Sequence, residues 1–163
     1  MDGNAVTVER KIAAPPAAIF DLIADAGRHP EIDGSGTVKR AQPGAPERLH
    51  LGATFGMAME MGLKYSMVNT VIEFDENRRI AWQTKPPGAP GLLVGGRIWR
   101  YELEPVAGGT LVRESWDTSH DRQRFVLKRF GMPAKTAGNM ARTLERIEQV
   151  LRSSADGSPP APG

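Results

Sequence analysis

Two charged residues, Arg97 and Glu114, occur in segments that alternate in polarity as β-strands do. Each shares a strand face with large apolar or aromatic residues, which are Trp99, Tyr101 and Leu103 for Arg97, and Val112 and Trp116 for Glu114. We expect both faces to point inward and to carry the two charges with them. A buried charge without a partner is costly, so the two residues either pair with each other or meet a polar group of a ligand.

These two residues are the candidate catalytic groups. In a functional interpretation, Arg97 orients a carbonyl or carboxylate, and Glu114 is a general base whose pKa is raised by burial. Tyr65 is a third polar candidate. In a structural interpretation, Arg97 and Glu114 form a satisfied ion pair near the mouth of a pocket and touch no substrate.

A stripe of methionines indicates an apolar wall. Residues 54–61 alternate, which places Phe55, Met57, Met59 and Met61 on one face. Met adapts to irregular apolar shapes, although the same face could simply fill the core. Aromatic residues offer ring surface with a hydrogen-bonding group, and the same alternative applies to them. The predicted ligand-binding residues are Phe55, Met57, Met59, Tyr65, Trp82, Arg97, Trp99, Tyr101, Glu114, Trp116 and Met140.

Several kinds of site are not indicated. The sequence has no cysteine, and its three histidines have neither a helical i+4 partner nor a carboxylate cluster, so we expect no metal. We also expect no cofactor, because phosphate-loop, dinucleotide-binding and G-x-S-x-G motifs are absent. His120 lies between Asp117 and Asp121, which could raise its basicity, although such a segment more often starts a helix.

The spacing of apolar residues predicts the elements that position these groups. Strand patterns cover residues 5–12, 37–42, 54–61, 65–74, 79–84, 97–103 and 110–118. Helical spacing covers residues 16–24, 123–130 and 134–152, the last with a strong apolar stripe. Short connections indicate an antiparallel meander, and only the last helix is long enough to cover it. The predicted fold class is α+β, in which a curved antiparallel sheet of about seven strands wraps a long C-terminal helix, with a short helix after the first strand.

Composition and charge set the broad class. The 163 residues carry a net charge of only +2 without a dense basic block, so a nucleic-acid partner is not expected. No segment predicts a secretory signal or a stable insertion into a membrane, and we expect a cytoplasmic protein. Residues 1–153 are predicted to form a single ligand-binding domain, followed by a disordered tail at 154–163. The loop at 85–96 contains Leu92, Leu93 and Val94, which suit either a lid or a subunit interface.

Three stretches resemble a known family. They are APPAAIFDLIAD at 14–25, VIEFDENRRIAW at 71–82 and WRYELEPVAGGTLVRES at 99–115, with LERIEQVL near the end of the last helix. Over residues 5–153 the chain resembles the polyketide cyclase/dehydrase and lipid-transport family (SRPBCC), within the START-like helix-grip superfamily that includes the birch pollen allergen fold. The resemblance implies that fold but says little about activity. One stretch departs from the family, because residues 29–32 lack the aromatic residues often found there.

Three functions follow as hypotheses. The first is binding of a small hydrophobic ligand, lipid-like or similar to an aromatic polyketide, in an internal pocket. The second is a polyketide cyclase/dehydratase-type enzyme that folds a flexible substrate into a reactive geometry. The third is a homodimeric interaction or regulatory protein without pocket chemistry. A superfamily of this kind supports unrelated activities, so the residues leave all three open.

Overall fold

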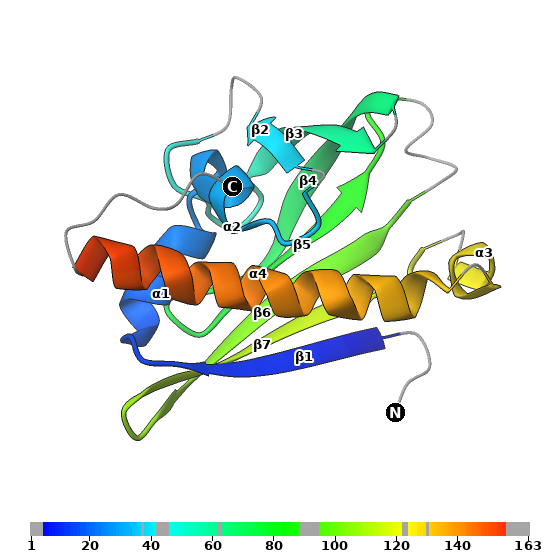
Figure 1. The fold of residues 1–163 in the computed structure, drawn as a ribbon. Helices are drawn as coiled ribbons and strands as arrows, with labels where there is room; N and C mark the ends of the chain where they lie inside the picture. Colours follow the sequence, from blue (N-terminus) through cyan, green and yellow to red (C-terminus); the bar gives the residue numbers. More distant parts are fainter. Residues whose placement is uncertain are drawn as a thin grey trace.

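A seven-stranded antiparallel sheet forms the body of the protein in this computed structural model, which describes residues 5–36, 38–41, 46–61, 63–88, 95–121, 124–129 and 131–155. The strand order is β1-β7-β6-β5-β4-β3-β2, and the sheet curls into a half-barrel (Figure 1). Its strands are β1 (Ala5–Ile12), β2 (Val38–Ala41), β3 (Thr54–Met61), β4 (Leu63–Asp75), β5 (Arg79–Lys85), β6 (Arg97–Val106) and β7 (Gly109–Asp117). The predicted α+β helix-grip fold is confirmed.

One long helix, α4 (Met132–Ala155), crosses one face of the sheet (Figure 1). We call the covered side of the sheet its inner face. The short helices are α1 (Pro16–Ile23), the 3-10 helix η1 (Ala26–Arg28), α2 (His29–Ile32) and α3 (Arg124–Arg129). In the view of Figure 1, α1 and α2 lie toward the C-terminal end of α4, and α3 lies at its N-terminal end.

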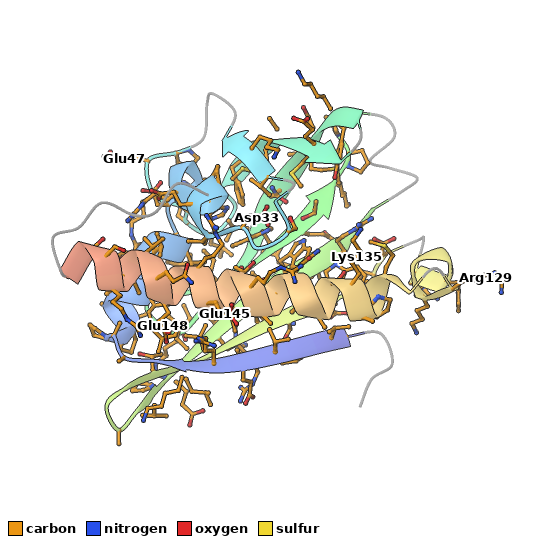
Figure 2. The ribbon with its side chains drawn as sticks, in the orientation of Figure 1. Asp33, Glu47, Arg129, Lys135, Glu145 and Glu148 are labelled. Atoms are coloured by element: carbon orange, nitrogen blue, oxygen red, sulfur yellow. The ribbon has the colours of Figure 1, made fainter. Side chains whose placement is uncertain are left out.

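The apolar stripe of α4 packs onto the inner face as its spacing predicts. Its buried residues recur every three or four positions: Thr136, Met140, Thr143, Leu144, Ile147 and Val150. The edge of α4 is tied to β1 by Arg10, which lies 3.1 Å from Glu148 and 3.9 Å from Glu145. Both acidic residues are labelled on α4 in Figure 2. A half-exposed ion pair of this kind fixes the orientation of the helix more than it adds stability.

Burial along the inner face changes from one end of the sheet to the other. Near Ile12, Ile80 and Leu103 the space between sheet and α4 is filled, and these side chains are at most 6% exposed. We call this the closed end. Toward the opposite ends of β1 and β6, and at the same side of the sheet on β3, the inner-face side chains of Val6, Trp99 and Met59 are only half-buried. We call this second region the open end.

The strands and helices differ from the predicted bounds mainly at their ends. β4 begins at Leu63 rather than 65, and β6 continues to Val106 because Pro105 pairs opposite Thr110 and leaves the turn to residues 107–108. The turn between β4 and β5 contains Asn77 at φ 62°, a backbone conformation that asparagine tolerates better than most residues. α4 runs to Ala155, so the predicted tail is helical at 154–155. Residues 156–163, and residues 89–94 of the predicted loop, lie outside the described part of the chain.

The segment after α2 lies directly against α4. Gly34 donates its backbone N–H to the Thr143 hydroxyl at 2.9 Å, and its carbonyl accepts from Arg142 at 3.0 Å. A Cβ on Gly34 would lie 2.4 Å from the Asn139 carbonyl oxygen and from the Thr143 nitrogen. Glycine is therefore required here by close approach of two backbones, and this contact places the neighbouring Asp33 over the sheet.

Candidate functional site

A buried carboxyl group, Glu114, lies on the inner face between the closed and open ends. The register of β6 and β7 places Glu114 opposite Tyr101, and both side chains point inward. The Tyr101 hydroxyl donates a hydrogen bond of 2.9 Å to Oε1 of Glu114. Glu114 is 2% exposed and Tyr101 is 5% exposed. The pair is therefore removed from water.

Burial decides the protonation state of this pair. Loss of hydration raises the pKa of Glu114 to about 8, the Tyr101 hydrogen bond opposes the rise, and the charge of Asp33 adds to it. Burial also raises the pKa of Tyr101 well above its usual value, with the charge of Glu114 adding to the effect. At pH 7 Glu114 is thus a neutral acid, which changes its chemistry from the general base suggested by the sequence to a proton donor.

Two buried polar atoms on β7 have no hydrogen-bond partner among the described residues. They are Oε2 of Glu114 and Nε1 of Trp116. The two residues are two positions apart, so both project from the same side of the strand. Buried polar groups in proteins are nearly always hydrogen-bonded, and leaving one unpaired carries a substantial cost. Trp116 is 2% exposed, so solvent does not satisfy it.

Aromatic rings line the inner face beside the Glu114–Tyr101 pair. Trp82 lies 5.7 Å from Tyr101 and 5.5 Å from Phe55, measured between ring centroids. Trp99 and Trp116 form a second pair at 6.2 Å on β6 and β7. These are the three tryptophans of the chain, and all of them lie on the inner face. The site combines a wide apolar surface with a small number of polar atoms, as ligand pockets do.

Arg97 does not pair with Glu114, so the predicted ion pair is wrong. Its Nε lies 3.1 Å from Oδ2 of Asp121, a carboxylate with no exposed surface, in the segment that follows β7. The strand register explains the difference, because Arg97 starts β6 four residues before Tyr101, roughly 13 Å along the strand. Arg97 fastens this segment to the sheet at the open end.

The remaining predicted site residues differ in how deeply they are buried. Phe55, Met57 and Met140 are buried in the interior. Met59 and Trp99 are half-buried, and Tyr65 is 38% exposed. Tyr65 and Met59 line a surface hollow of about 360 Å³ together with Lys39, Ala58, Glu60, Lys64 and Ser66. This hollow contains neither Glu114 nor Trp116. Buried polar atoms without a partner among the described residues also occur on Arg10 and Asn77, but only Glu114 and Trp116 place two of them on one strand face. We therefore place the candidate site at the buried carboxyl group.

Sequence reasoning missed His29. Its ring stacks on Trp82 at 5.1 Å and meets Phe55 edge-on at 5.4 Å, while Nε2 donates to the Ile23 carbonyl at 2.8 Å. Burial lowers the pKa of His29, so the ring is neutral at pH 7. A four-residue helix carries too little periodicity for this burial to be read from the sequence.

Asp33 and a buried amide contact were missed as well. Asp33, labelled in Figure 2, follows α2 and acts electrostatically on both Glu114 and Tyr101. Asn69 on β4 accepts a 2.6 Å hydrogen bond from the Thr84 hydroxyl on β5. The alternation of β4 places Asn69 on the inner face, which is the signal that could have identified it.

Two kinds of feature are absent from the described residues. No group of three or more histidine, aspartate or glutamate side chains among them is arranged to hold a metal ion. No helix in this part of the chain is long and apolar enough to cross a membrane.

A curled antiparallel sheet closed by one long helix defines a helix-grip protein. The sequence matches the family described as polyketide cyclase / dehydrase and lipid transport over residues 4–152. The chain belongs to this family.

Proteins similar to this chain include a curated relative and solved structures of the same fold. An uncharacterized protein of Mycobacterium tuberculosis is 34% identical over 109 residues, and the match covers 66% of this chain and 44% of that relative. The chain thus spans less than half the length of this curated relative. A crystal structure from Nitrosomonas europaea has a TM-score of 0.69 at 15% identity, covering 96% of this chain and 99% of that one. A polyketide cyclase-like protein from Corynebacterium glutamicum has a TM-score of 0.57 at 23% identity, covering 96% and 97%.

Proposed function

We propose that this protein binds a small hydrophobic molecule between the inner face and α4, at the open end. The observation that carries the proposal is the pair of buried polar atoms without partners, Oε2 of Glu114 and Nε1 of Trp116, beside an aromatic surface. A core that served stability alone would satisfy these atoms or replace them with apolar groups. A ligand that contacts both the rings and the polar atoms accounts for their retention.

The route to this site follows the gradient of burial. Glu114 and Trp116 are covered, whereas Trp99, which lies opposite Trp116, is only half-buried on the same face. The ligand therefore reaches the carboxyl group by displacing side chains at the open end, while the closed end keeps the sheet and α4 together. Movement of side chains and short segments on ligand binding is common in such sites.

The first experiment is native mass spectrometry of the purified chain, followed by denaturing extraction of any small molecule that travels with it. The protein is also incubated with fatty acids and with aromatic polyketide mimics. We expect a 1:1 complex with at least one of these classes. Protein that stays empty throughout contradicts the proposal and favours the interaction-protein hypothesis.

The second experiment locates the ligand. The three tryptophans give three indole N–H signals in a proton–nitrogen NMR spectrum, and all three rings lie on the inner face. We expect the ligand to shift the signals of Trp99 and Trp116. The variant Trp99→Ala should weaken binding about tenfold through lost stacking, whereas Ile72→Ala, which removes apolar surface from a 38% exposed residue, should leave binding unchanged. Shifts confined to the surface hollow at Tyr65 would place the site elsewhere.

A second candidate function is acid–base catalysis on the bound molecule, as in a cyclase or dehydratase. It is favoured by the burial of Glu114 beside the Tyr101 hydroxyl, which raises the pKa of the carboxyl group to about 8 and lets it donate and regain a proton near neutral pH. In that case extraction after incubation with a polyketide-like substrate yields a changed molecule, and Glu114→Gln yields the substrate unchanged.

The homodimer and the cytoplasmic location remain predictions from the sequence. A homodimer is tested by light scattering on the eluting protein at several concentrations. If residues 85–96 form the interface, truncating Leu92, Leu93 and Val94 to alanine gives a monomer. If they form a lid, the same substitutions change ligand affinity instead. Cytoplasmic location is tested by cell fractionation.

A further inference from the structure

The unpaired polar atoms on β7 define what the ligand must carry. We infer that the bound molecule presents a neutral acceptor oxygen, such as a ketone or ester carbonyl, to a hydrogen-bond donor site formed by Glu114 and Trp116. This inference rests on the proposed function and names the class of ligand that the site selects.

Trp116 determines that the site donates a hydrogen bond to the ligand. The indole Nε1 carries one hydrogen and has no lone pair to offer, so it can only donate. It is buried on the inner face without a partner among the described residues. A ligand ammonium or hydroxyl hydrogen at this position would leave the indole N–H unsatisfied. An acceptor oxygen satisfies it.

Glu114 is a donor in the same place. Its Oε1 accepts from the Tyr101 hydroxyl, so the proton of the neutral acid is carried by Oε2, the atom without a partner. Burial, which raises the pKa of Glu114 to about 8, keeps that proton in place at pH 7. Protonated carboxyl groups of this kind are strong hydrogen-bond donors to a carbonyl.

The surroundings disfavour a charged ligand group. The titratable groups that act on Glu114 are Tyr101 on β6 and Asp33 after α2, and the charge of Asp33 opposes a second negative charge. On β1, the residue opposite Glu114 is Val8. The buried residues of α4 are apolar or threonine. Arg97, on the same face, is already paired with Asp121 at 3.1 Å, and no basic group is among those that act on Glu114. A carboxylate would therefore enter at a large desolvation cost.

A matched set of naphthalene probes tests the inference. The probes are 2-acetylnaphthalene, 2-ethylnaphthalene, 2-naphthoic acid and 1-(2-naphthyl)ethylamine, which share one ring system and differ in the polar group. Binding to the full chain is followed by the indole N–H signals at pH 7. We expect the ketone to bind about tenfold more tightly than the hydrocarbon, with the acid and the amine weaker than the ketone.

Variants of the two donors give an independent readout. Trp116→Phe keeps an aromatic ring but removes Nε1 and part of the indole surface, so the preference for the ketone over the hydrocarbon should shrink from about tenfold to about threefold. Glu114→Gln keeps an oxygen for Tyr101 and offers an N–H₂ donor, so it should bind the ketone within about threefold of wild type. Between pH 7 and pH 9 the wild-type affinity for the ketone should fall about tenfold as the carboxyl ionises, whereas Glu114→Gln should show no change.

The outcomes separate the inference from the proposed function. If ketone and hydrocarbon bind equally well and both shift the tryptophan signals, the pocket is real and the donor site is wrong. If the amine binds most tightly, Glu114 acts as a carboxylate and the inference is overturned. If no naphthalene or fatty-acid probe binds, the proposed function fails and the inference fails with it.

Discussion

At the scale of single residues, the protein keeps one carboxyl group in a setting where charge is unfavourable. Glu114 has one oxygen satisfied by Tyr101 and one oxygen unsatisfied, and no basic side chain is among the groups acting on it. The result is a neutral acid at physiological pH. The cost of this arrangement appears in the stability of the protein, where it can be measured.

The first prediction concerns the pH dependence of unfolding. The pKa of Glu114 rises from an ordinary value of 4.5 to about 8 on folding. Its contribution to stability is therefore complete below pH 4.5 and is lost as the pH rises to about 8, at up to about 1.4 kcal/mol per pH unit. Relative to wild type, Glu114→Gln should become more stable with each step from pH 5 to pH 8 and then level off, as measured by urea unfolding.

His29 also makes the stability of the protein depend on pH, so its effect must be removed by comparison with a variant that keeps it. Burial lowers its pKa from 6.5, so below pH 6.5 the unfolded chain binds a proton that the folded protein lacks. Its effect on stability has the opposite sign to that of Glu114 and is lost as the pH falls. Because the wild type and Glu114→Gln share His29, the difference between their curves isolates Glu114. Parallel curves from pH 5 to pH 8 would show that Glu114 is ionised in the folded protein.

At the scale of elements, the position of α4 over the sheet depends on contacts with the segment that follows α2. The close approach of Gly34 to Asn139 and Thr143 leaves no space for a side chain. Arg146 adds a 2.9 Å hydrogen bond to the Glu31 carbonyl of α2. These contacts hold Asp33 near Glu114, so the packing of α2 on α4 is part of what sets the chemistry of the site.

The second prediction compares Gly34, which contacts the backbone of α4, with Gly138, which lies within that helix. Gly34→Ala forces a Cβ to 2.4 Å from the α4 backbone and should lower the free energy of unfolding by about 1–3 kcal/mol. Gly138→Ala, within α4, meets only the Arg142 guanidinium at 3.6 Å and should raise it by up to about 1 kcal/mol, because alanine favours helix. Urea unfolding of both variants checks the two signs. A neutral Gly34→Ala would mean that α2 and α4 do not pack closely.

At the scale of the whole molecule, the half-barrel is closed at one end and lightly covered at the other. The closed end buries Ile12, Ile80 and Leu103 in one apolar cluster with residues of α1 and of the C-terminal half of α4, among them Phe20 and Ile147. At the open end, Trp99 and Met59 retain solvent contact. A fold built in this way can admit a ligand at one end without losing the packing that maintains the other.

The third prediction is a gradient of backbone protection along the same strands. In hydrogen exchange followed by mass spectrometry, amides in residues 80–82 and 101–103 should exchange more slowly than those in residues 97–99, because fewer buried apolar contacts resist local opening at the open end. A bound ligand should slow exchange at residues 97–99 and 115–117 in particular. Equal protection at both ends, with or without a ligand, would remove the open end as the route of binding.

The sequence by itself determined which elements form and which side of each faces inward. Alternation along β6 and β7 placed Trp99, Tyr101, Glu114 and Trp116 on the inner face, and the apolar stripe identified α4 as the covering helix. These are local signals, because a strand repeats every two residues and a helix every 3.6. Such periods can be read from a single chain.

Only the tertiary structure decided which inward side chains meet. Strand register placed Tyr101, rather than Arg97, opposite Glu114 and left Arg97 to Asp121, a residue outside any strand. The burial of His29 depends on α2 packing against Phe55 and Trp82 of the sheet, far away in the sequence. The position of Asp33 depends on the contact between Gly34 and α4. The protonation state of Glu114 follows from these distant contacts, because desolvation and charge act through space and leave no period in the sequence.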